Sequence, residues 1–169
     1  GGAQSELGEL YRKGEGVGRD EKEALKWLRK SAEQGNSKGQ ANLGYLYSRG
    51  IGVAADPGEA VKWYRLSAEQ GDEDGLNRLG YAYESGRGVD LDLKKAAELY
   101  GLAMAKGSLQ AQINLGNMHR EGLGMPKDEA KALELYRGAA EREHPGAWNA
   151  LGIAYRKGYG VEPDMGEAV

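Results

Sequence analysis

A 36-residue repeat constrains the fold of this chain more than any other feature. The dipeptide Leu-Gly marks its register, with copies at Leu7-Gly8, Leu43-Gly44, Leu79-Gly80, Leu115-Gly116 and Leu151-Gly152. Further glycines, an aspartate and an alanine recur in the same register. A period of about 20–50 residues is typical of arrays of small units that stack in a row. We therefore predict a single solenoid domain over residues 1–169, divided into repeats 3–38, 39–74, 75–110, 111–146 and a truncated 147–169.

Each repeat has the pattern of two helices. In the second repeat, small and apolar residues follow helical spacing over residues 39–49. Gly50 is placed to end this helix in a left-handed conformation, which glycine adopts without strain. Asp56 and Pro57 supply the N-cap and first-turn proline of a second helix, which Gly71 ends. Because one such pair cannot bury both of its apolar stripes alone, we predict an all-α solenoid of helix-turn-helix repeats.

The repeat also explains an unusual glycine content, 28 of 169 residues. Gly8 and its equivalents fall inside the first helix of each repeat, where a glycine costs about 1 kcal/mol relative to alanine. A recurrent glycine at this place predicts that another backbone crosses too closely to leave room for a Cβ.

Charge and cysteine content exclude several partners and cofactors. The formal net charge is −3, so the chain lacks the basic field that binds nucleic acid. Without cysteine there is neither a disulfide framework nor a thiolate metal site. The sequence contains no apolar run of about 18 residues, and we expect no membrane insertion. We expect no cofactor and no metal.

Short patterns that resemble catalytic or nucleotide-binding sites have structural explanations. Residues 35–39 match G-x-S-x-G, but a nucleophile elbow joins a strand to a helix and this loop joins two helices. Residues 86–88 resemble a phosphate-binding loop, yet they follow a helix where a strand is required. His119 stands where other repeats have tyrosine and is expected to pack, and Trp27 and Trp63 are expected in the core. We therefore predict that the chain is not an enzyme.

The motifs of the second repeat resemble those of a known family. Leu-Gly-x-x-Tyr, Gly-x-Gly-Val-x-x-Asp, Ala-x-x-Trp-Tyr and Ala-Glu-Gln-Gly stand at residues 43–71. They are similar to the Sel-1-like repeat (SLR), a relative of the tetratricopeptide repeat (TPR), and the resemblance covers nearly the whole chain. It implies a TPR-like α/α right-handed superhelical solenoid that acts as a protein-protein interaction scaffold. The disulfides of the cysteine-rich bacterial members are impossible here.

The resemblance also implies where a partner binds. In TPR-like arrays, one side of each first helix lines a concave groove. The matching positions of this chain give eleven candidate partner-binding residues: Tyr45, Arg49, Asn77, Tyr81, Glu84, Ile113, Asn117, Arg120, Asn149, Ile153 and Arg156. The tyrosines are rigid aromatic anchors and the asparagines can hydrogen-bond an extended backbone. Basic residues outnumber acidic ones on this face, which favours an acidic partner.

We therefore expect an adaptor that binds a protein or peptide in the groove. Two alternatives stay open. One is a small-molecule binder or hydrolase like that proposed for cysteine-rich relatives, although Ser-x-x-Lys occurs nowhere in the chain. The other is a self-assembling segment with a homotypic contact through the truncated C-terminal repeat.

Overall fold

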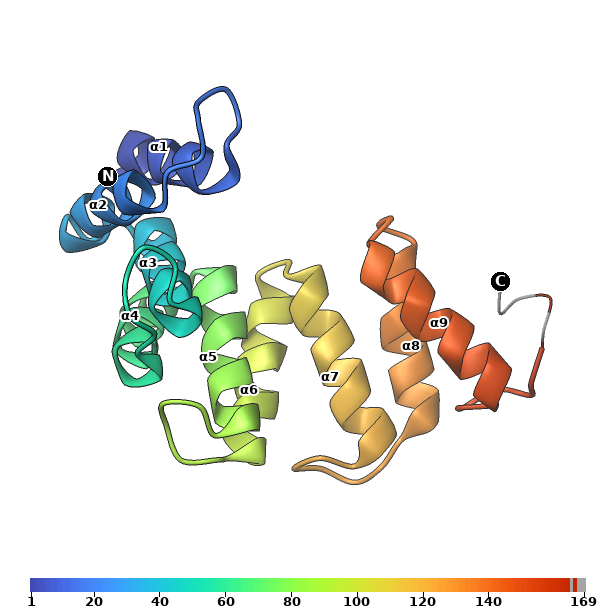
Figure 1. Cartoon of the computed structure of the whole chain (residues 1–169). Coiled ribbons are helices and arrows are strands. Elements are labelled where there is room, and N and C mark those ends of the chain that lie inside the picture. The colour runs from blue at the N-terminus through green and yellow to red at the C-terminus, as the bar shows by residue number, and fades with distance from the viewer. Residues whose placement is uncertain (165, 167–169) are drawn as a thin grey trace. The chain divides into compact units, whose positions relative to one another are not determined.

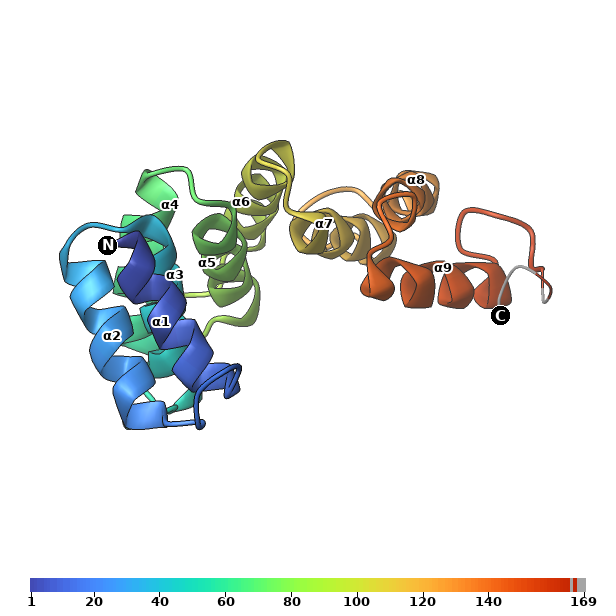
Figure 2. The same ribbon diagram turned by 90° about the horizontal axis from the view of Figure 1, so that it is seen from above.

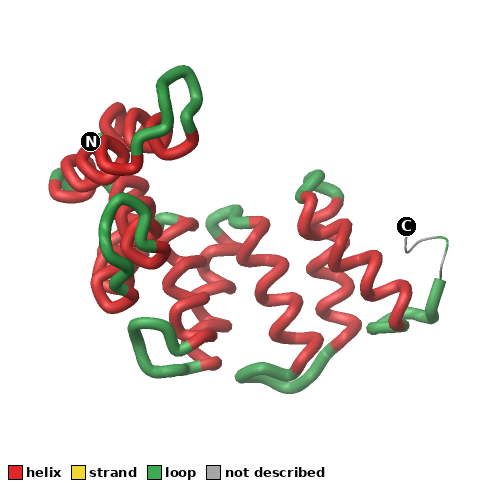
Figure 3. The backbone as a smooth tube through the Cα atoms, in the orientation of Figure 1, coloured by secondary structure: helices red, strands yellow, loops and turns green. Residues whose placement is uncertain are grey.

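The computed structural model describes residues 1–164 and residue 166, and its only regular elements there are nine α-helices (Figure 3). The chain divides into two compact units, Gly1–Leu91 and Asp92–Val169. Unit 1 contains α1 (Gly2–Lys13), α2 (Glu21–Glu33), α3 (Ser37–Arg49), α4 (Pro57–Glu69) and α5 (Glu73–Ser85) (Figure 1). Unit 2 contains α6 (Leu93–Ala105), α7 (Leu109–Glu121), α8 (Glu129–Ala140) and α9 (Pro145–Lys157). The predicted all-α solenoid of helix pairs is confirmed. No helix of the described residues is long and apolar enough to cross a membrane.

Local caps set the helix boundaries much as the sequence predicts. Gly50 ends α3 at a φ of 69°, in the left-handed region. Asp56 caps α4, and its carboxylate accepts a hydrogen bond from the backbone N–H of Glu59 at 2.9 Å. The start of α3 differs from the prediction of residue 39. Asn36 accepts a hydrogen bond from the N–H of Gly39 at 2.8 Å, so the helix begins two residues earlier, at Ser37.

In the first three repeats, the second helix ends two residues before the predicted glycine. In unit 1, α4 ends at Glu69 and the left-handed Gly71 follows with a φ of 75°. In unit 2, the equivalent place after α8 is held by Glu143 at a φ of 58°. Glu143 is the one non-glycine residue with positive φ in the described part of the chain. The fold therefore imposes this conformation even where the sequence supplies no glycine.

The first helices of the repeats in unit 1 form a layer, which we call the A-layer: α1, α3 and α5. The central helix α3 contacts both α1 and α5, whereas α2 and α4 make no comparable contact with each other (Figure 2). Helices that approach more closely lie on the inside of a curved stack. Unit 1 therefore curves toward its A-layer.

The glycines inside the first helices make room mainly for side chains, not for the crossing backbone that the sequence predicts. A Cβ on Gly44 would lie 2.6 Å from Cε1 of Tyr64, and one on Gly116 would lie 2.6 Å from Cε1 of Tyr136. At Gly8 the neighbour is Cγ of Leu28, also at 2.6 Å. The prediction of a close approach is right, but its cause is a large side chain of the second helix that inserts against the first.

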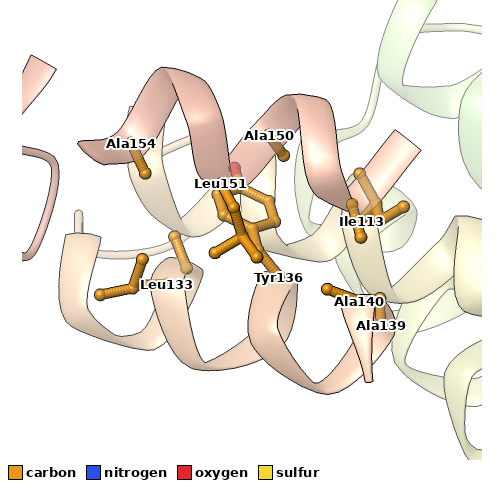
Figure 4. Close-up of a cluster of buried hydrophobic side chains, with 10 residues drawn as sticks. Ile113, Leu133, Tyr136, Ala139, Ala140, Ala150, Leu151 and Ala154 are labelled. Atoms are coloured by element: carbon orange, nitrogen blue, oxygen red, sulfur yellow. The ribbon is translucent and has the colours of Figure 1, made fainter. Parts of the chain in front are cut away.

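The core of unit 2 is centred on one such side chain, Tyr136 of α8 (Figure 4). It packs among Leu133, Leu151 and Ala150, while its hydroxyl donates a hydrogen bond to Oδ1 of Asn117 at 2.7 Å. Burial raises the pKa of the Tyr136 hydroxyl. The polar end of a buried tyrosine is thus satisfied within the unit, as a buried donor must be.

Successive repeats meet where one residue of a second helix packs against one residue of the next first helix. We call this contact the seam, and the two residues keep the same combined size from repeat to repeat. A Cβ on Gly75 would lie 2.6 Å from Cβ of Ser67, and a Cβ on Gly39 would lie 2.7 Å from Cβ of Ser31. Both serines are completely buried, and Ser67 donates to the carbonyl of Ser37 at 2.9 Å. Unit 2 places two buried alanines at each equivalent pair of positions, Ala103 with Ala111 and Ala139 with Ala147. Serine plus glycine and alanine plus alanine have the same number of side-chain heavy atoms, so the seam keeps its packing volume.

A second recurring contact joins neighbouring repeats on the surface. Arginines donate to tyrosine hydroxyls 18 residues later in the pairs Arg29–Tyr47 (2.9 Å), Arg65–Tyr83 (3.1 Å) and Arg137–Tyr155 (2.9 Å). The fourth pair of positions holds Gly101 and His119 instead. His119 is half-buried, and its Nδ1 is buried with no hydrogen-bond partner among the described residues. Its predicted packing role is consistent with this burial, but the hydrogen bond is lost.

The two tryptophans predicted in the core are both half-buried. Trp63 packs against the cluster of Leu28 and Leu43. The Nε1 of Trp27 donates to Glu23 at 3.1 Å, and the ammonium of Lys30 lies 4.9 Å from its ring centroid. Both rings are thus partly buried, and charged side chains of α2 lie beside that of Trp27.

Candidate functional site

Five of the predicted partner-binding residues lie on two adjacent helices of the A-layer. Tyr45 and Arg49 belong to α3, and Asn77, Tyr81 and Glu84 belong to α5. Tyr81 is 53% exposed, and Arg49 is exposed as well, whereas Tyr45 is half-buried. The A-layer of unit 1 therefore brings together aromatic and polar side chains that are not fully buried in the core.

Three arginines surround the ring of Tyr45, one from each helix of the A-layer. The guanidinium carbons of Arg12, Arg49 and Arg78 lie 5.5, 5.9 and 4.7 Å from the ring centroid. We call these four residues the Tyr45 cluster. A guanidinium within about 6 Å of an aromatic ring gains about 0.5–1 kcal/mol at an exposed site. The cluster thus holds three positive charges around one aromatic ring.

Arg12 is the member that is held most firmly. Its Nε and Nη2 donate to the two carboxylate oxygens of Glu9 at 2.8 and 2.7 Å. This hydrogen bond raises the pKa of Arg12 above its ordinary value. A bidentate pair of this kind fixes the plane of the guanidinium. Glu9 therefore positions Arg12 against Tyr45 and neutralises one of the three charges.

Arg78 lies near a buried tyrosine. Burial raises the pKa of the Tyr64 hydroxyl on α4, and the positive charge of Arg78 acts in the opposite direction. Nε of Arg78 is buried with no hydrogen-bond partner in the described residues. Asp74 lies one helical turn earlier and attracts Arg78 electrostatically, but within the described ranges the two form no ion pair of 4 Å or less. Arg78 thus keeps an unused donor.

Sequence reasoning missed two members of this cluster. Arg12 and Arg78 are absent from the eleven predicted residues. Arg78 is the only basic residue in its column of the repeat, where the other copies have Glu6, Asn42, Asn114 and Ala150. That departure is a signal in the sequence. The approach of Arg78 to Tyr45 nevertheless depends on how α5 packs beside α3.

In unit 2, one predicted residue is buried in the core, and the side chains of two others already interact with neighbouring residues. Ile113 is only 5% exposed and belongs to the core around Tyr136, so its assignment to the groove is wrong. Its apolar side chain is buried between α7 and the helices that pack on it. Asn117 uses its side-chain oxygen for Tyr136. Arg120 pairs with the neighbouring Glu121, and its guanidinium lies 5.6 Å from the ring centroid of Tyr159.

The remaining predicted residues, Asn149, Ile153 and Arg156, line a hollow of about 670 Å³ between α8 and α9. Trp148 also lines it and is 59% exposed. The predicted homotypic contact falls on the fifth repeat, of which residues 165 and 167–169 lie outside the described residues.

The G-x-S-x-G pattern of unit 1 joins two helices, α2 and α3, and lacks the preceding strand of a nucleophile elbow. Ser37 begins α3 after a helix, and its hydroxyl donates to Oδ2 of Asp72 at 3.0 Å. The two histidines of the sequence both belong to unit 2. In residues 1–164 and 166, no three of the metal-ligating side chains gather in a group that could hold a metal ion.

Comparisons with known proteins agree with this architecture. The family model described as Sel1 repeat matches residues 2–36, 37–72, 74–108, 109–144 and 147–169. A protective antigen of uropathogenic Escherichia coli strains with an SLR fold is 37% identical, with a TM-score of 0.81. A Sel1 repeat protein from Oxalobacter formigenes is 36% identical, with a TM-score of 0.86. A comparison with curated proteins gives no significant match.

Coverage differs among these solved structures. Each of the two matches covers 99% of this chain, which spans 36% of the Escherichia coli protein and 66% of the Oxalobacter protein. Helicobacter pylori cysteine rich protein B is 24% identical, with a TM-score of 0.59 over 76% of this chain and 92% of its own. At that identity the likeness to the cysteine-rich protein shows the fold alone.

Proposed function

The chain belongs to the Sel1 repeat family, and we propose that it is a non-catalytic adaptor that binds a segment of a partner protein along its first helices. Members of this family are generally protein-protein interaction scaffolds and typically not enzymes. The A-layer of unit 1 is the surface for which the structure gives most support. The partner residues proposed there are Tyr45, Arg49, Asn77, Tyr81 and Glu84.

The observation that carries the proposal is the exposure of Tyr81. A tyrosine that leaves 53% of its surface in water, on the layer toward which unit 1 curves, is a large amphipathic contact that packing does not require. Tyrosine is enriched among the residues that contribute most to binding, because it buries much area at a small entropic cost. Tyr81 is therefore the proposed anchor.

The size of the A-layer favours a peptide segment over a globular partner. Helices of 12 or 13 residues are about 18–20 Å long. Three of them, spaced by about 9 Å, present a face of roughly 500 Å². A stable interface between globular proteins buries about 800 Å² on each side. An extended segment of about eight residues, at about 3.3 Å each, spans the three helices.

A peptide-display selection on the whole chain tests the adaptor proposal. We expect enriched peptides to bind Tyr81→Ala about tenfold more weakly, as expected when an aromatic anchor is truncated. Leu66→Ala is the matched control, because Leu66 is 43% exposed on α4, outside the A-layer. A selection that enriches no peptide, or peptides that are lost with Leu66→Ala and retained by Tyr81→Ala, would overturn the proposal.

A second candidate is self-association through unit 2. It is favoured by the hollow beside α9 and by the exposure of Trp148 at its rim. Sedimentation velocity over a hundredfold range of concentration tests this candidate. A sedimentation coefficient that rises with concentration, and no longer rises after Trp148→Ala, would support it. A coefficient that stays constant in the wild type would refute it.

A further inference from the structure

We propose that the Tyr45 cluster binds the carboxylate side chains of an acidic peptide segment. This inference rests on the proposed adaptor function, because it assigns a chemistry to the partner that the A-layer receives. The ligand groups are Asp or Glu side chains within the segment. The protein groups are the guanidiniums of Arg49 and Arg78, with Arg12 held beside them.

The first step of the argument is the balance of charge. Three guanidiniums lie within 6 Å of the centroid of one ring. Glu9 forms the only ion pair of the cluster within the described residues, and it uses Arg12. Asp74 acts on Arg78 and Glu15 acts on Arg12 at longer range, and Glu15 also lies 3.9 Å from the ammonium of Lys13. Among the described residues, Arg49 and Arg78 therefore have no carboxylate at ion-pair distance, and an acidic segment would supply one.

The second step is the supply of free donors. Arg49 is exposed on the last turn of α3, and within residues 1–164 it makes no ion pair and no side-chain hydrogen bond. Nε of Arg78 also has no hydrogen-bond partner in the described part of unit 1, but this nitrogen is buried and out of reach of a ligand. A guanidinium has five N–H donors and binds carboxylate oxygens in a planar, bidentate manner. Arg49 thus offers the donors that a carboxylate needs, and Arg78 adds its positive charge beside the same ring.

The third step is the rigidity of the site. The cluster collects one arginine from each of α1, α3 and α5, and Tyr45 serves as the common platform. Glu9 fixes Arg12, and Nε of Arg78 is buried within the layer. A site that is ordered before binding loses less entropy when the ligand arrives. Because its charges come from three helices, the cluster suits several side-chain carboxylates along a segment better than one terminal carboxylate.

A purely structural role makes a different prediction. If the arginines serve only to hold the three helices together, substitutions in the cluster change the stability of unit 1 and leave the preference for acidic peptides unchanged. Arg49→Gln separates these roles, because Arg49 is exposed and takes no part in the ion pair. Lys22→Gln on α2 is the charge-matched control, since Lys22 is exposed and its side chain has no partner among the described residues.

The experiment uses peptides that display selects on the whole chain. Each is synthesised as selected and with Asn or Gln in place of every Asp or Glu, and every peptide is acetylated and amidated so that no terminal carboxylate remains. Dissociation constants are measured by calorimetry at about 50 and 300 mM salt, because screening weakens exposed charge pairs. We expect the acidic form to bind about tenfold more tightly at low salt, the scale of a charged hydrogen bond.

The variants then assign the preference to the cluster. We expect Arg49→Gln to reduce the ratio between acidic and neutral peptides at least threefold, while Lys22→Gln leaves it unchanged. Acidic and neutral forms that bind equally would overturn this inference while leaving the adaptor function in place, provided that Tyr81→Ala weakens both forms. An equal loss with Lys22→Gln would also overturn it. Failure of every peptide to bind would overturn both proposals.

Discussion

The substitution Gly44→Ala tests the packing that defines the repeat. Gly44 lies inside α3, where alanine should stabilise an isolated helix by about 1 kcal/mol. In the folded chain, the added Cβ would lie 2.6 and 2.7 Å from two ring carbons of Tyr64 and 3.0 Å from the carbonyl oxygen of Ala60. The ring is buried and cannot turn aside freely. The same substitution is therefore favourable for the helix and unfavourable for the fold.

The magnitude follows from these two opposing effects. Overpacking a well-filled core costs about 1–3 kcal/mol. The added Cβ meets the Ala60 carbonyl oxygen as well as the ring, so the upper end of this range applies. After the gain in helix propensity is subtracted, we expect a net loss of about 2 kcal/mol in the free energy of unfolding. For a chain of this length, that loss lowers Tm by about 4–8 °C.

The chain offers a matched control in Gly101, which also lies inside a helix, α6. No atom lies within 4 Å of a Cβ built on Gly101. We therefore expect Gly101→Ala to raise the free energy of unfolding by about 1 kcal/mol. Both variants are compared with the wild type by thermal and urea unfolding followed by circular dichroism. A Tm for Gly44→Ala at or above that of the wild type would refute the packing argument.

Three further predictions concern other contacts between repeats. Gly75→Ala alone should lower Tm by several degrees, because its Cβ meets Ser67. The double substitution with Ser67→Ala should recover most of this loss, since it recreates the alanine pair of unit 2. Additive losses of the two substitutions in thermal unfolding would contradict the shared seam. Glu143→Gly should stabilise the chain by about 1 kcal/mol in urea unfolding, because it relieves the left-handed conformation of a non-glycine residue; a loss of stability would mean that the Glu143 side chain makes a contact that outweighs this strain. Gly101→Arg combined with His119→Tyr should restore the recurring arginine–tyrosine hydrogen bond, and a double-mutant cycle should show a favourable coupling of about 0.5–1 kcal/mol; a coupling of zero would show that the pairs elsewhere do not stabilise the stack.

Much of the local structure follows from residues that are close in the sequence. The N-caps at Asp56 and the left-handed end at Gly50 are decided by hydrogen bonds and backbone sterics within a few residues. The prediction is less exact at Asn36, because an N-cap asparagine in a Gly-Asn-Ser loop is easily read as part of the turn. Such errors shift a boundary by two residues and leave the architecture unchanged.

The candidate site was only partly predictable. The repeat register placed Tyr45, Arg49 and Tyr81 on the surface of the A-layer, because the side of a helix that avoids the apolar stripe must face water. It could not show that Arg78 reaches Tyr45, since that contact depends on the offset between α3 and α5. It also placed Ile113 on the surface, although a single apolar side chain in that column is buried when a neighbouring helix can cover it.

The sequence alone determined the period, the all-α class and the family, because these depend on spacing and on local backbone preferences that repeat five times. Only the tertiary structure decided what the helix-interior glycines accommodate and which charges meet around Tyr45. The physical reason is the range of the interactions. Caps and helical periods act over a few residues, whereas a ring inserted at Gly44 or a guanidinium stacked on Tyr45 depends on how whole helices are positioned when their buried surfaces pack.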